Sequence, residues 1–121
     1  MHQIILYACG VINALFVAFH LLLGWNIQRL PSLAPGYRAL LHAFNVGGVL
    51  MVAFLAAAFL ACQADLRSHL GRLTILLGAL VYLMRALSEV VFFPHAHWAI
   101  LVLCVLTAAL HLAALRAAPA A

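Results

Sequence analysis

Long runs of apolar residues, separated by short polar stretches, are the main pattern along this 121-residue chain. The runs cover residues 4–23, 39–62, 73–93 and 98–115. Each is close to the roughly 20 residues that an α-helix needs to cross a ~30 Å hydrocarbon layer. Apolar residues lie on nearly every side of each run, whereas a transmembrane β-strand would alternate polar and apolar positions. The pattern therefore predicts four transmembrane helices.

The polar stretches between these runs are short, so consecutive helices should lie antiparallel. The first connection, residues 24–36, contains two prolines, which favour turns and extended backbone. The second, residues 63–72, is the most polar stretch of the chain, and the third covers only residues 94–97. None is long enough to separate domains. We expect one membrane domain over residues 1–121, folded as an all-α, antiparallel four-helix transmembrane bundle.

The composition supports a membrane protein and excludes a nucleic-acid partner. Hydrophobic residues make up 69% of the chain and charged residues only 7%. A soluble domain of this size could not bury so large a share of apolar side chains in its core. The net charge of +4 comes from arginines at helix ends, where they suit phospholipid headgroups. The expected partners are the lipid bilayer and, beyond it, either subunits of a membrane complex or further copies of this chain.

Arginines also suggest an orientation in the membrane. Arg67, Arg72 and Arg116 flank the side of the termini, and Arg29 and Arg38 flank the other side. Cytoplasmic loops carry an excess of basic residues, so we expect an integral protein of the plasma (inner) membrane with both termini in the cytoplasm. None of the three cysteines lies in the connections on the opposite side, and no disulfide framework is expected.

Depth in the membrane brings several polar residues to the side opposite the termini. His20 lies about one turn before the end of the first run, and His42 about one turn after the start of the second. Glu89 lies about one turn before the end of the third run, and His97 precedes the fourth. We expect these four residues to occupy one layer. His95 belongs to the tight turn, and His2, His69 and His111 are left outside the site.

Helical periodicity adds further residues to this layer. Positions three, four, seven or eleven apart share a helix face, which groups Asn13 with His20, Asn45 with His42, and Tyr82 and Arg85 with Glu89. Polar groups in a span are costly to expose to lipid, so these faces should point inward. The small Gly48 should admit a close approach of the first two helices.

The chemistry of these side chains is compatible with three kinds of ligand. His20, His42, Glu89 and His97 are candidate ligands of a transition metal, although no short motif such as HExxH is present. Two histidines from different helices could instead hold a b-type haem. A quinone is the third candidate, because histidine, tyrosine and arginine side chains can hydrogen-bond its carbonyl oxygens and Glu89 can exchange protons. Besides Glu89, the candidate ligand-binding residues are Arg85, Tyr82, Asn45 and Asn13.

A structural role for the same residues is the alternative. Arg85 and Glu89 are four residues apart and can form an ion pair within one helix, while His20 and His42 can bond to each other or to Asn45. Three classes of function follow: a membrane protein that binds a ligand, with or without a redox role; a non-catalytic accessory or assembly subunit of a larger membrane complex; and a transporter of a small solute or cation. No catalytic residue is assigned.

Overall fold

The computed structural model describes residues 2–92 and 97–117, and this part of the chain contains helices and no strand. All four long helices are long and apolar enough to cross a membrane. The prediction of an all-α, four-helix integral membrane protein in contact with the lipid bilayer is confirmed. The elements, in order, are α1 (His2–Gln28), α2 (Pro35–Ala61), the short 3₁₀ turn η1 (Asp65–Arg67), α3 (His69–Phe92) and α4 (Trp98–Ala117).

Most helix ends extend beyond the apolar runs that predicted them. The first run ends at residue 23, but α1 continues through Trp25 and Asn26 to Gln28. Likewise α3 begins at His69, four residues before the third run. Hydropathy marks only the hydrocarbon layer, whereas backbone N–H and C=O groups favour helical hydrogen bonds in the headgroup layer as well. The apolar pattern therefore locates the helices but underestimates their length.

Local signals account for where the second and third helices begin. Pro35 occupies the first position of α2, where its missing N–H and fixed φ angle are tolerated. At α3 the hydroxyl of Ser68 accepts a 3.0 Å hydrogen bond from the Gly71 N–H and caps the helix. Arg38 closes the α1–α2 connection by donating to the carbonyl oxygens of Leu30 and Leu33, at 2.7 and 3.2 Å.

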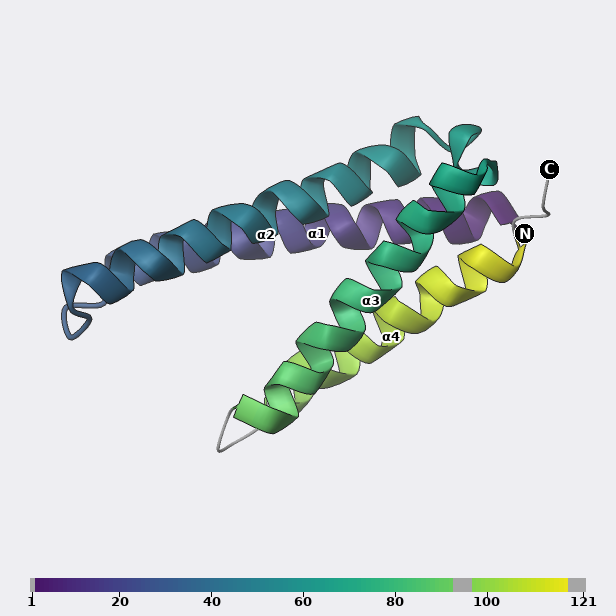
Figure 1. Ribbon diagram of the computed structural model, residues 1–121. Helices are drawn as coiled ribbons and strands as arrows, with labels where there is room; N and C mark the ends of the chain where they lie inside the picture. Colours follow the sequence, from purple (N-terminus) through teal and green to yellow (C-terminus); the bar gives the residue numbers. More distant parts are fainter. Residues whose placement is uncertain (1, 93–96, 118–121) are drawn as a thin grey trace.

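The four helices form two antiparallel hairpins that meet at one end (Figure 1). The first hairpin packs α1 along α2, and the second packs α3 along α4. Contact between the hairpins is made chiefly by α1 and α4. Figure 1 shows the hairpins close together near the termini and diverging toward their loops. The bundle is therefore V-shaped, closed on the side of the termini and open on the other side.

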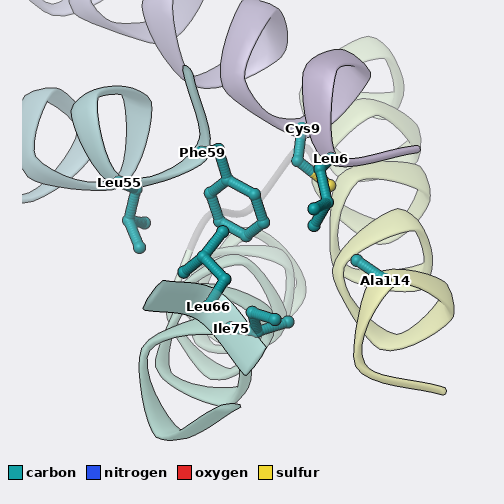
Figure 2. Close-up of a cluster of buried hydrophobic side chains, with 7 residues drawn as sticks. All are labelled: Leu6, Cys9, Leu55, Phe59, Leu66, Ile75 and Ala114. Carbon is teal, nitrogen blue, oxygen red and sulfur yellow. The ribbon is translucent and has the colours of Figure 1, made fainter. Parts of the chain in front are cut away.

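An apolar cluster fills the closed end of the V (Figure 2). All four helices and η1 contribute side chains to it, with Phe59 of α2 completely buried. Lipid solvates apolar side chains nearly as well as a protein core does, so this cluster stabilises the junction mainly through close packing. Its members are Leu6, Cys9, Leu55, Phe59, Leu66, Ile75 and Ala114.

Gly71 is required where α3 packs against η1, because a Cβ at this position would clash with the carbonyl oxygen of Asp65 and the backbone of Leu66. We predict that Gly71→Ala lowers the free energy of unfolding by about 1–3 kcal/mol, the usual cost of overpacking. Gly36→Ala is the matched control, since a Cβ at Gly36 meets no atom within 4 Å. Unfolding by SDS in detergent micelles measures both variants, and equal stabilities would contradict this packing.

Candidate functional site

A hydrogen-bonded network of three buried side chains joins the two hairpins. The Asn13 side chain of α1 donates from Nδ2 to the Cys9 carbonyl oxygen at 2.8 Å and lies 3.2 Å from His111 Nε2 of α4. The hydroxyl of Tyr82 on α3 donates to Asn13 Oδ1 at 2.8 Å. Asn13 and His111 have no exposed surface, and Tyr82 is also buried. One amide side chain thus connects three helices.

The partners of His111 determine which ring nitrogen carries the proton. Nδ1 lies 2.8 Å from the carbonyl oxygen of Thr107, which can only accept, so Nδ1 is the donor. Nε2 then accepts the second hydrogen of the Asn13 amide. Every polar atom of the Asn13 amide therefore has a partner, and so do both His111 nitrogens. Such a network of neutral groups suits an environment without water.

Aromatic side chains enclose this network. The Phe59 ring of α2 packs edge-on against the His111 ring, with centroids 5.0 Å apart. Phe16 lies 4.9 Å from the Tyr82 ring, and Tyr82 lies 5.5 Å from His111. Gly78 of α3 leaves the space that the His111 ring occupies. The network is consequently surrounded by residues from all four helices.

A second polar group, Arg85, Glu89 and His97, connects α3 to the start of α4. Glu89 Oε1 accepts hydrogen bonds from the backbone N–H of His97 at 2.9 Å and from its Nδ1 at 2.6 Å. Glu89 Oε2 accepts from Arg85 at 2.6 Å, which confirms the ion pair predicted within this helix. The carboxylate is fully buried and lies at the N-terminus of α4, where the helix dipole favours a negative charge.

The third polar group lies within the α1–α2 hairpin. His20 Nδ1 bonds to Asn45 Oδ1 at 3.0 Å, and Asn45 Nδ2 donates to the His20 carbonyl oxygen at 2.9 Å. A Cβ at Gly48 would lie 2.9 Å from the His20 ring, so the predicted close approach at this glycine is confirmed. His42 Nε2 is buried and has no hydrogen-bond partner among the described residues.

The hydrogen bonds divide the predicted site residues between the two arms of the V. His20, His42 and Asn45 belong to the α1–α2 hairpin, whereas Arg85, Glu89 and His97 belong to the α3–α4 hairpin. In Figure 1 the end of α1 and the start of α2 lie well away from the end of α3 and the start of α4. Tyr82 and Asn13 form the link between the hairpins instead.

Within residues 2–92 and 97–117, no three His, Cys, Asp or Glu residues are placed to hold one metal ion. The assignment of His20, His42, Glu89 and His97 as metal ligands stays a prediction, as do the b-type haem and the quinone. His95 lies outside the described residues.

His111 is the main residue that the sequence prediction left out. It shares a helix face with Cys104 and Ala108, both of which are buried. That shared face indicated an inward position, but His111 was excluded because it is far from the layer of the other histidines. Asn13 and Tyr82, which also lie deep in their helices, were the signal that could have identified it. A buried imidazole needs a polar partner, and these two residues were available at a similar depth.

Removing the Tyr82 hydroxyl should weaken the junction between the hairpins. We predict that Tyr82→Phe lowers the free energy of unfolding by about 0.6 kcal/mol, the average for hydrogen bonds between membrane helices, and by no more than about 1.7 kcal/mol, because Asn13 Oδ1 loses its donor. Tyr37→Phe is the control, since Tyr37 is 69% exposed at the start of α2. SDS unfolding of the two variants side by side gives the comparison. A Tyr82→Phe protein as stable as Tyr37→Phe would rule out this role.

The space beside His111 provides a second test. A Cβ at Gly78 would lie 2.5 Å from His111 Cδ2, and two hydrogen bonds hold that ring in place. Gly78→Ala should therefore cost about 1–3 kcal/mol of stability despite the better helix propensity of alanine. Gly47→Ala, with no atom within 4 Å of its Cβ, should be neutral or slightly stabilising. Thermal unfolding in detergent measures both, and a neutral Gly78→Ala would contradict the packing at His111.

Comparisons of this chain with protein family models, with curated proteins and with solved structures found no match. The chain is a small integral membrane protein with four spanning helices.

Proposed function

We propose that this chain is a non-catalytic subunit of a larger membrane complex, and that a transmembrane helix of a partner protein occupies the angle between its two hairpins. The observation that carries the proposal is the divergence of the hairpins toward their loops, with polar side chains in both diverging halves. A polar side chain within a membrane span is normally covered by protein or water. A partner helix would provide that cover.

Arg85 gives the strongest support for a covered surface. Its side chain lies within the span of α3 and is 41% exposed, although it pairs with Glu89. Charged residues at this depth almost always face other protein groups or a water-filled cavity. Glu89 is fully buried and is engaged by Arg85 and His97 together. The exposed part of the guanidinium therefore lies at a surface that a neighbouring chain could cover.

The charge balance of the sequence favours a different protein over a second copy of this chain. The chain has only two acidic residues, Asp65 and Glu89. Asp65 lies in η1, on the side of the termini, and Glu89 is already engaged. A second copy would bring no free carboxylate to the level of Arg85. We infer that the partner helix carries an acidic or amide side chain near this level.

The polar groups already form hydrogen bonds within the chain, which supports a subunit role over a ligand-binding or catalytic role. Both oxygens of Glu89 accept hydrogen bonds, and His20 uses Nδ1 to hold Asn45. These groups join helices and do not converge on a common point. The orientation with both termini in the cytoplasm, in the plasma membrane, remains part of this proposal and is supported by the arginine distribution.

Substitution of Arg85 tests the proposal. The chain is purified from its native membranes in a mild detergent, and native mass spectrometry measures how much of it carries a stoichiometric partner. Arg85→Gln should reduce this fraction at least roughly tenfold, because a charge-assisted interface contact is lost. Arg85→Lys should retain the partner in part. Arg29→Gln is the control, since Arg29 lies at the same membrane side but stacks on Trp25 at 4.4 Å.

Circular dichroism and thermal unfolding establish that each variant is folded before its partner content is compared. The proposal fails if the wild-type chain is recovered as a monomer or only as a homo-oligomer. It also fails if a folded Arg85→Gln variant retains its partner as well as Arg29→Gln does.

A further inference from the structure

Two adjoining cavities lie beside the first turns of α1, on the side of the termini. The smaller, of about 280 Å³, is lined by Gln3, Leu6, Gln63, Ala64 and Arg67. The larger, of about 560 Å³, is a shallow and largely open hollow along one face of α1, and its described lining residues are Gln3, Ile4, Tyr7, Ala8, Val11 and Ile12. Gln3 lines both, so the two are neighbours at the start of α1.

The smaller cavity offers several hydrogen-bond donors at the membrane surface. It lies where α1 begins, α2 has just ended and η1 turns the chain toward α3. The Arg67 guanidinium is exposed here and makes no hydrogen bond or ion pair with another described residue. The side-chain amides of Gln3 and Gln63 line the same space, where Gln63 Nε2 already donates one of its two hydrogens to the Phe59 carbonyl oxygen at 2.9 Å. None of the described residues that line it carries a carboxylate. Guanidinium and amide donors are suited to the oxygens of a phosphate group.

The larger cavity continues from this polar end toward the middle of the membrane. Its lining residues follow one face of α1 from Ile4 to Ile12, a rise of about 12 Å at 1.5 Å per residue. Ile4, Tyr7 and Val11 are 73%, 59% and 42% exposed, so the groove is accessible from the bilayer. Apart from Gln3 and the Tyr7 hydroxyl, its lining side chains are apolar. A hydrocarbon chain is the ligand that suits such a groove.

We propose that these cavities form a binding site for one anionic phospholipid. The phosphate group occupies the smaller cavity against Arg67 and the amides of Gln3 and Gln63, and one acyl chain lies in the groove along α1. The order of the two cavities matches the order of groups in a phospholipid, with the polar part at headgroup depth and the apolar part deeper. A free phosphate would use only the smaller cavity. The site is independent of the partner surface proposed around Arg85.

Native mass spectrometry of the full chain in detergent, titrated with phosphatidylglycerol or phosphatidylcholine, tests the site. We expect one phosphatidylglycerol molecule to bind more tightly than phosphatidylcholine. Arg67→Gln should weaken phosphatidylglycerol binding about fivefold, the usual effect of one arginine near a membrane surface. Arg116→Gln, which removes the same charge from the end of α4 on the same side, should change the affinity less than about twofold.

A substitution in the groove tests the acyl-chain part separately. Ala8→Leu adds volume to the groove and should weaken the binding of both phospholipids, while Arg67→Gln acts mainly on the anionic one. Circular dichroism verifies that the variants are folded. The proposal is overturned if Arg67→Gln binds phosphatidylglycerol as tightly as Arg116→Gln does. It is also overturned if millimolar inorganic phosphate displaces phosphatidylglycerol, because the smaller cavity alone would then account for binding.

Discussion

The side-chain amide of Asn13 is the interaction on which the arrangement of the helices depends. It accepts a hydrogen bond from Tyr82 of α3 and donates to His111 of α4, while its second amide hydrogen bonds to its own helix at Cys9. Within lipid there is no hydrophobic force that drives helices together, so packing and hydrogen bonds determine which helices meet. The buried amide, with Phe59 packed on the His111 ring, defines where the two hairpins join.

Each hairpin is held by polar contacts of its own at the opposite end. His20 and Asn45 join α1 to α2, and Glu89 joins the end of α3 to the start of α4. These hydrogen bonds form within each hairpin and do not connect one hairpin to the other. The result is a V whose closed end is tightly packed and whose open end exposes part of a charged side chain, Arg85, within the membrane.

The two ends of the molecule therefore suit two kinds of partner. At the open end, the Arg85 side chain is partly exposed within the membrane span although it pairs with Glu89, which is why we assign a helix of another protein to that surface. At the closed end, the helices leave a polar cavity at the membrane surface and an apolar groove below it. A phospholipid combines a polar and an apolar part in the same order. A protein partner and a lipid could thus bind at the same time.

Hydropathy and helical periodicity alone predict the four spans, the inward position of Asn13, Tyr82 and Glu89, and the ion pair of Arg85 with Glu89. They do not predict which inward faces meet, because that depends on how the two hairpins pack. Depth along a helix specifies the distance from the membrane surface, but not the lateral distance to residues at the same depth. His20 and Glu89 were therefore expected in one layer, yet their hydrogen bonds lie in different hairpins, while His111 joins Asn13 and Tyr82 because α1 and α4 pack together.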